Sequence, residues 1–114
     1  MRDPIERLRD MQEAIAAIER HSSRERSEFD GDELLQARFV RHLQIIGEAT
    51  RAIPENIRDR APDIPWPQIA GMRNVLVHGY FDVDADLVWD TATRDIPKLK
   101  PAIERLINTL QQAE

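Results

Sequence analysis

Apolar residues recur at three- and four-residue spacing along most of the chain, which is the pattern of amphipathic helices. Asp3 and Pro4 suit the start of a first helix. Its apolar positions are Ile5, Leu8, Met11, Ile15 and Ile18. A second series is long enough to predict a central helix, with apolar positions at Leu35, Phe39, Leu43, Ile46, Ala49 and Ile53. Pro54 marks the expected end of this helix.

Two polar segments separate these helices from the rest of the chain. The stretch HSSRERSEFDGDE, residues 21–33, is predicted to be a loop with a helix cap at Asp30 or Asp32. The stretch PENIRDRAPDIPWP, residues 54–67, contains four prolines. We expect it to be an irregular, extended crossover, because proline removes a backbone donor and disfavours regular structure.

The C-terminal half predicts further helices. One should begin near Trp66 or Pro67 and stop at Gly79, and DVDAD, residues 82–86, supplies caps for the next. After Pro97 two alternatives remain: a new helix starting near Lys98, or one long kinked helix. Its apolar positions are Leu99, Ile103, Leu106 and Leu110. The sequence therefore predicts an all-α bundle of four or five helices in a single domain, residues 1–114.

Composition narrows the class of protein. A length of 114 residues with 41% hydrophobic and 32% charged residues is typical of one globular domain. No cysteine is present, which excludes a disulfide framework and a thiolate zinc site. No apolar run is long enough to span a membrane, and the first residues lack the apolar core of a signal peptide. We expect a soluble, cytoplasmic protein without a membrane partner.

The charge balance leaves two interpretations open. The formal net charge is −5, which does not by itself attract nucleic acid. Fourteen of the sixteen basic residues are arginine, whose planar fork binds phosphates and carboxylates. This bias is compatible with local phosphate sites. It is equally compatible with a genome-wide preference for arginine over lysine.

The segment MRNVLVHGYFDVD, residues 72–84, concentrates candidate chemistry. On a helix Asn74 and His78 share one face, whereas Arg73 points about 140° away from His78. Only a long side chain or a distorted helix end can bring both to one phosphate. Taken alone, His78 reads more simply as a helix cap or packing residue, and Tyr80 as a residue packing on Phe81 or Trp89.

Other polar and small residues have plainer interpretations. His21 and His42 have no comparable neighbourhood and are expected to be surface or boundary residues. Glu48 has two interpretations, an ion pair with Arg73 or Arg51 and a solvated surface carboxylate, and the second is the simpler. Helix packing is the expected reason for Gly47 and Gly71.

The aspartates after the histidine segment suggest a metal site only weakly. Asp82, Asp84 and Asp86 lack the glycine and terminal glutamate of a calcium loop, and helix capping explains them. We expect no metal and no cofactor.

The string from Arg73 to Tyr80, with Asn74 and His78 inside it, resembles the R-x4-H-x-Y signature of the HEPN superfamily in its HepT-like toxin branch. IIGEAT (residues 45–50), PWPQIAGMRN (65–74), YFDVDADLVWDT (80–91) and DIPKL (95–99) agree with that branch. The resemblance covers roughly residues 3 to 110.

The resemblance implies an RNA-cleaving toxin that acts as a homodimer, with higher oligomers left open, and two motif copies facing a cleft. It also implies a minimal nucleotidyltransferase antitoxin that transfers AMP from ATP to Tyr80. Histidine suits proton transfer at neutral pH, and arginine suits the charge that develops on the phosphate. In this interpretation Arg73 and His78 are catalytic and Asn74 positions the substrate. The alternative is a non-catalytic nucleotide- or RNA-binding module of the same fold that scaffolds its partner.

Overall fold

A computed structural model describes residues 3–22, 25–77 and 84–112, with the side chains of residue 22 and of residues 72–77 outside the description. Within these ranges the chain is helical and contains no strand. The helices are α1 (Pro4–Ser22), α2 (Arg26–Asp30), α3 (Glu33–Ala52), α4 (Glu55–Arg58), α5 (Trp66–Val77), α6 (Ala85–Asp90), the π-helix η1 (Thr91–Asp95) and α7 (Ile96–Gln112). The all-α prediction is confirmed.

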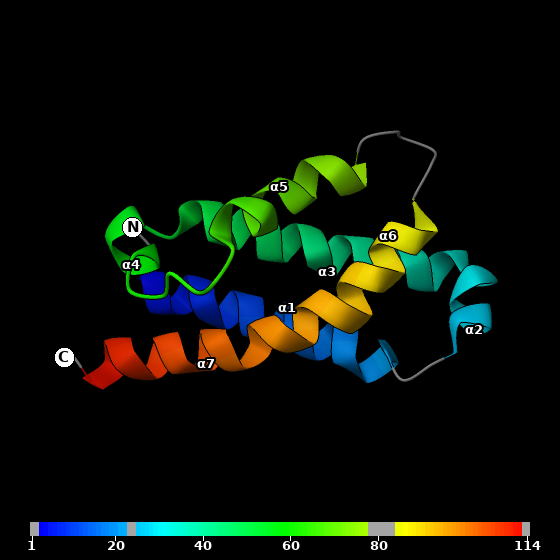
Figure 1. Ribbon diagram of the computed structural model, residues 1–114. Helices are drawn as coiled ribbons and strands as arrows, with labels where there is room; N and C mark the ends of the chain where they lie inside the picture. Colours follow the sequence, from blue (N-terminus) through cyan, green and yellow to red (C-terminus); the bar gives the residue numbers. More distant parts are fainter. Residues whose placement is uncertain (1–2, 23–24, 78–83, 113–114) are drawn as a thin grey trace.

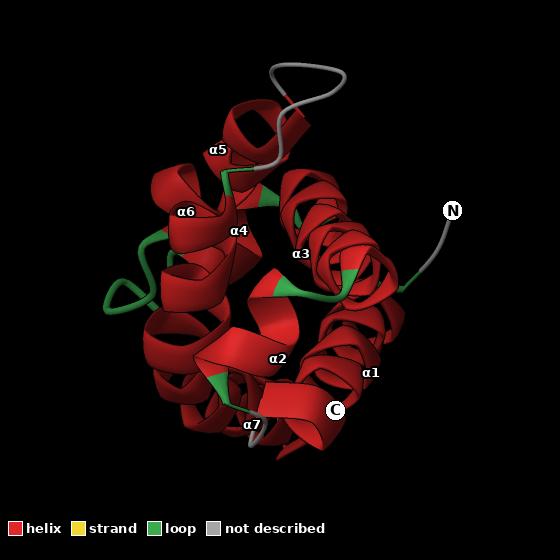
Figure 2. Cartoon of the chain, turned by 90° about the vertical axis from the view of Figure 1, so that its right-hand side faces the viewer, coloured by secondary structure: helices red, strands yellow, loops and turns green. Residues whose placement is uncertain are grey.

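The long helices form an elongated bundle with α3 at its centre. Helix α3 packs against α1 on one side and α5 on the other, and α7 closes the bundle by packing against α1. Helices α1 and α5 both run antiparallel to α3, so their C-terminal ends lie at the same end of the molecule (Figure 1). The end view shows α5, α3, α1 and α7 arranged around a common interior (Figure 2).

The interior is built from the predicted apolar faces. Every predicted apolar position from Leu35 to Ile53 on and after α3 is buried, as are Leu8, Met11, Ile15 and Ile18 on α1. Ile5 is only partly buried. The four predicted apolar positions of α7 are buried as well. Removing these apolar stripes from contact with water is the main force that stabilises the bundle.

Aspartates start three of the helices, as the sequence predicts. The side chain of Asp3 accepts a hydrogen bond from the backbone N–H of Ile5 at 2.8 Å. Asp32 caps α3 by accepting from the N–H of Leu35 at 3.0 Å. Asp84 caps α6 in the same manner. The open choice between Asp30 and Asp32 is thereby decided in favour of Asp32.

The two polar segments contain short helices that the sequence did not predict. Residues 21–33 include α2, because Phe29 turns into the core and is fully buried. Residues 54–67 include the single turn α4, for which Pro54 is the N-terminal flanking residue. Proline suits that position, because a backbone N–H at the start of a helix has no acceptor within the helix and its absence therefore costs nothing. The prediction of a plain loop and of a wholly irregular crossover was therefore wrong in these two places.

Helices α6, η1 and α7 form one continuous helical run from Ala85 to Gln112. Pro97 has no N–H, so the carbonyl of Thr93 has no α-helical donor. The N–H of Ile96 instead bonds to the carbonyl of Thr91, five residues back, which widens the helix into a π turn. Of the two alternatives left open after Pro97, the single distorted helix is the one observed, with Pro101 inside α7.

Candidate functional site

Helix α5 carries the first part of the candidate motif, and its start is firmly anchored. The indole Nε1 of Trp66 donates hydrogen bonds to the carbonyls of Arg58 and Ala61, both at 3.1 Å. Trp66 and Ile69 are buried against the core. Because α5 packs along α3, its far end at Val77 is held at a fixed place on the bundle.

The structure describes only part of the candidate site. Arg73 and Asn74 lie in the last two turns of α5, as predicted, and their backbone is helical. Their side chains are outside the description, and His78 and Tyr80 lie outside the described residues altogether. The convergence of these four residues therefore stays a prediction. The predicted helix stop at Gly79 also falls outside the described part of the chain.

The described residues resume at Asp84, directly before α6, and contacts with α2 hold α6 in place. Asp86 forms an ion pair with Arg26 of α2, and Arg26 also pairs with Asp30 at 2.7 Å. Below this contact, the ring of Phe29 lies 5.1 Å from that of Trp89 on α6, measured between centroids. Polar and aromatic contacts thus fix both α2 and the helix that follows the motif.

The aspartates near the motif act as caps and ion-pair partners in the described region. Asp84 caps α6 and Asp86 pairs with Arg26. No group of three or more possible metal ligands occurs among the described residues. The prediction that helix capping explains these aspartates is confirmed for Asp84, and Asp82 lies outside the description.

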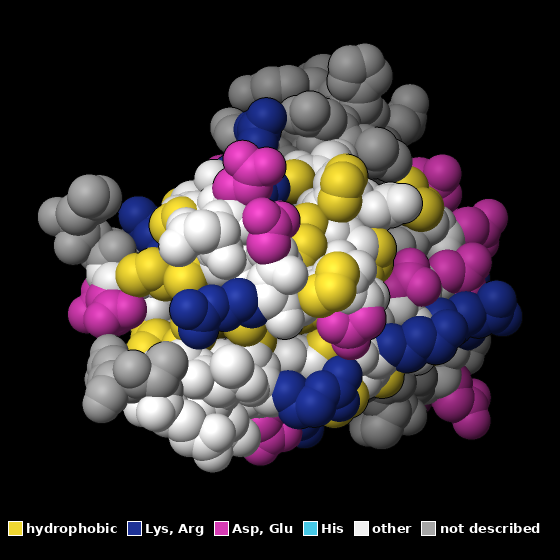
Figure 3. All heavy atoms as spheres, turned by 60° about the vertical axis from the view of Figure 1, so that its left-hand side comes forward, with side chains coloured by type: hydrophobic (Ala, Val, Ile, Leu, Met, Phe, Trp, Pro, Cys, Tyr) yellow, Lys and Arg dark blue, Asp and Glu magenta, His cyan; other side chains and the backbone are white. Residues whose placement is uncertain are grey.

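A groove of about 590 Å³ lies between the start of α5 and the α6–η1–α7 run. Its apolar wall includes Ile64, Ile69, Leu87 and Leu99, and charged residues stand at its rim. Hydrophobic side chains reach the surface between charged ones on the face shown in Figure 3. The volume is within the range of small-molecule sites, which are usually mostly apolar.

A second hollow, of about 480 Å³, lies between α1 and α3 and includes His42. Burial, followed by the positive charges of Arg20, Arg41, Arg38 and His21, lowers the pKa of His42 below its ordinary value. His42 is half-buried, as predicted for a boundary residue. Its cationic surroundings were not predicted. The signal in the sequence is the run Arg38-x-x-Arg41-His42, which places these side chains within one helical turn.

Glu48 and Gly71 complete the set of residues singled out from the sequence. Glu48 is exposed on α3, as predicted. Among the residues that the structure describes, a Cβ added at Gly71 would meet nothing within 4 Å, so close approach of another described helix does not explain this glycine. The packing interpretation of Gly71 was wrong, whereas Gly47 is buried as that interpretation requires.

Comparison with known proteins defines the class. The family profile "Ribonuclease HepT-like" matches residues 11–106. A protein of Thermococcus cleftensis named "Probable ribonuclease HepT" is 42% identical over 100 residues, which cover 87% of this chain and 91% of that protein. The Methanocaldococcus jannaschii protein named "Putative RNase MJ0125" is 41% identical over 85 residues, which cover 75% of this chain and 73% of that protein. The Caldanaerobacter subterraneus protein named "Putative RNase TTE0752" is 37% identical over 97 residues, which cover 85% of this chain and 87% of that protein. No solved structure matches the chain significantly.

The protein is an all-α bundle, and the ribonuclease family matches it over most of its length. These two findings define the protein as a ribonuclease. The chain belongs to the HepT-like ribonuclease family, which confirms the resemblance seen in the sequence. No helix in the described ranges is long and apolar enough to cross a membrane.

Proposed function

We propose that this chain is the toxin of a toxin–antitoxin system and cuts RNA internally without a metal ion. The observation that carries the proposal is the family match over residues 11–106, which includes the whole R-x4-H-x-Y string at the end of α5. The fold supports it in one further respect: α3 and the anchored Trp66 fix the helix on which the string begins.

In the proposed reaction the imidazole of His78 takes the proton from a ribose 2'-hydroxyl. The 2'-oxygen then attacks the adjacent phosphorus, and the bond to the 5'-oxygen breaks. His78, or its copy in a second subunit, returns a proton to that leaving oxygen. The products are a 2',3'-cyclic phosphate and a 5'-hydroxyl.

Arg73 and Asn74 stabilise and orient the reacting phosphate in this scheme. Negative charge grows on the phosphoryl oxygens in the transition state, and the arginine fork binds two of them at once. Because Arg73 and His78 diverge by about 140° on a regular helix, each site is proposed to combine groups from two chains of a homodimer.

Tyr80 is proposed as the point of control. A nucleotidyltransferase antitoxin would join AMP from ATP to the phenol oxygen, with release of pyrophosphate. The added phosphate would place bulk and negative charge where the RNA backbone must bind, and so exclude substrate.

The test is cleavage of tRNA and mRNA by purified protein. The parent should cut RNA, and His78→Ala and Arg73→Ala should each lower kcat by roughly 10²- to 10⁴-fold. No cleavage by the parent, or full cleavage by His78→Ala, would refute the enzyme proposal. Mixing the two variants should restore part of the activity, since one of the two sites in a heterodimer regains both groups.

A further inference from the structure

Three arginines lie close enough to His42, in the hollow between α1 and α3, for their charges to act on its imidazole. Arg20 at the end of α1 lines it together with His42 of α3. Arg38 lies one helical turn before His42, and Arg41 directly precedes it. Arg20, Arg38 and Arg41 are exposed. We call these three arginines with His42 the α1–α3 basic patch.

The arginines of this patch are not neutralised by acidic partners in the described part of the chain. The ion pairs of that part use Arg26, Lys100 and Arg105 instead. The side-chain Nδ1 of His42 is shielded from solvent and has no hydrogen-bond partner among the described residues. The hollow also contains Asp10 and Glu13, which lie two turns or more before Arg20 on α1. Positive charge is therefore concentrated at the Arg20 end.

That end of the bundle is also the one to which α5 brings the motif. Helices α1 and α5 run in the same direction on either side of α3, and both end near the first half of α3 (Figures 1 and 2). Arg38 and Arg41 belong to that first half. The patch and the end of α5 thus belong to the same half of the bundle, with α3 between α1 and α5.

We propose that the α1–α3 basic patch binds the phosphate backbone of the RNA substrate at a distance from the scissile bond. Arginine forks hold two phosphate oxygens each, and a spacing of one helical turn between Arg38 and Arg41 or His42 places them along a strand. The patch gives an enzyme with a net charge of −5 a local attraction for a polyanion. The inference rests on the proposed function, because RNA is the substrate named there.

The first experiment measures binding without cleavage. A single-stranded RNA with 2'-O-methyl groups at every position, which lacks the attacking hydroxyl, is titrated with the double variant Arg38→Gln/Arg41→Gln at several salt concentrations. The variant should bind at least about tenfold more weakly, and the slope of log affinity against log salt should fall by about 1.4, or 0.7 for each lost phosphate contact.

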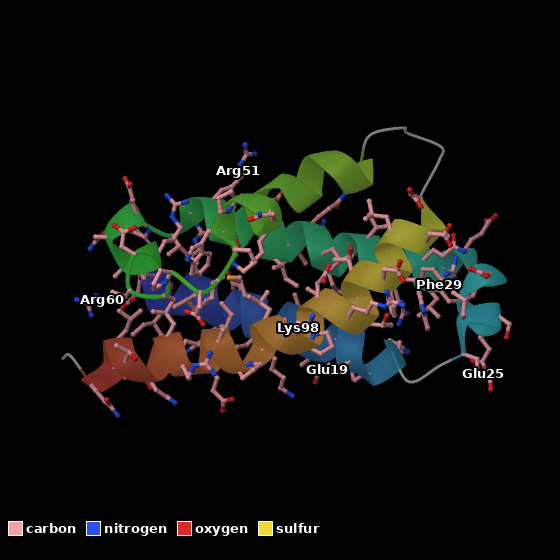
Figure 4. All side chains as sticks on the ribbon, viewed as in Figure 1. Glu19, Glu25, Phe29, Arg51, Arg60 and Lys98 are labelled. Carbon is pink, nitrogen blue, oxygen red and sulfur yellow. The ribbon has the colours of Figure 1, made fainter. Side chains whose placement is uncertain are left out.

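The matched control carries the same loss of charge elsewhere. Arg9→Gln/Arg60→Gln removes two exposed arginines from outside the patch, and Arg60 lies near α4 at the opposite end of the molecule (Figure 4). This variant should keep the parent's affinity and salt slope. Equal losses in the two variants, an unchanged slope in the patch variant, or no RNA binding by the parent would overturn the proposal.

The second experiment separates the patch from the chemistry. Removing the patch should raise KM for long RNA and leave kcat unchanged, whereas a dinucleotide, too short to reach the patch, should be cut equally by parent and variant. A parent that binds RNA through the patch but never cuts it would sink the proposed function and leave this inference standing. If the parent and the patch variant cut both substrates equally well, the proposed function would stand and the proposed role of Arg38 and Arg41 would be refuted.

Discussion

Arg26 of α2 forms an ion pair with Asp86 of α6, although 60 residues separate them in the chain. The hydrogen bonds of the Arg26 guanidinium to Asp30 and then to Asp86 raise its pKa, so the side chain keeps its charge at any ordinary pH. The contact joins α2 to α6, the helix that follows the motif in the sequence. Asp86 is exposed and Arg26 is partly exposed, however, so solvent and salt screen the attraction between the two charges.

The first prediction concerns that ion pair. In a double-mutant cycle of Arg26→Gln and Asp86→Asn, unfolding in urea should show a favourable coupling at about 50 mM salt that disappears near 1 M, because salt screens exposed charges. Asp90→Asn, on the same helix, serves as the control and should show no coupling to Arg26. Additive effects at low salt would mean that the pair does not hold the two helices together.

The second prediction concerns Phe29, the buried residue of α2. Its ring lies 5.3 Å from that of Phe39 and 5.1 Å from that of Trp89, measured between centroids. Phe29→Ala should lower the free energy of unfolding by about 3–5 kcal/mol, since it leaves a cavity beside the two remaining rings. Chemical denaturation followed by Trp fluorescence measures the loss. The exposed neighbour Glu28→Ala should change stability little, and an equally small effect of Phe29→Ala would show that α2 is not seated in the core.

The third prediction follows from the lowered pKa of His42. The folded protein binds the proton less readily than the unfolded chain, so stability is constant above the ordinary histidine pKa of about 6.5 and falls as pH drops from there through the folded pKa. Replacing His42 by Gln should flatten this decline. The groups facing it are Arg20, His21, Arg38 and Arg41, with Asp10 and Glu13 in the same hollow.

Urea denaturation between about pH 5 and pH 8 tests the His42 prediction, with His21→Gln as the control. The control should retain a decline. If both variants followed the parent's curve, the source of the acid sensitivity would lie elsewhere, in carboxylates that titrate at lower pH.

Periodicity predicted the long helices well because their stability comes from the same apolar stripes that the sequence displays. Helix α2 was missed since a single aromatic residue, Phe29, decides its place through contacts with residues far away in the chain. The π turn of η1 depends on which carbonyl loses its donor at Pro97, and periodicity alone left two outcomes there.

In the candidate site, too, the features set by residues close together in the sequence were predicted, whereas those set by contacts between distant parts of the chain were not. The motif and its place on a helix end were predicted from neighbouring residues, and the helical backbone at Arg73 and Asn74 agrees with that prediction. The α1–α3 basic patch joins two helices, and Arg20 of α1 comes near His42 of α3 only after folding. Spacing along the chain can indicate the members of the patch on α3, Arg38, Arg41 and His42, but not the addition of Arg20 from another helix.

The last prediction concerns Gly71, two residues before Arg73 on α5. Glycine inside a helix costs about 1 kcal/mol relative to alanine, and no atom of the described part of the chain lies within 4 Å of the position that a Cβ of residue 71 would take. Gly71→Ala should therefore raise the free energy of unfolding by about 0.5–1 kcal/mol. The reverse change at the preceding residue, Ala70→Gly, should lower it by a similar amount, and destabilisation by Gly71→Ala would refute the helical geometry assigned to this turn. If the variant were more stable but cut RNA more slowly, the open space beside α5 would be space that the substrate or a second subunit occupies.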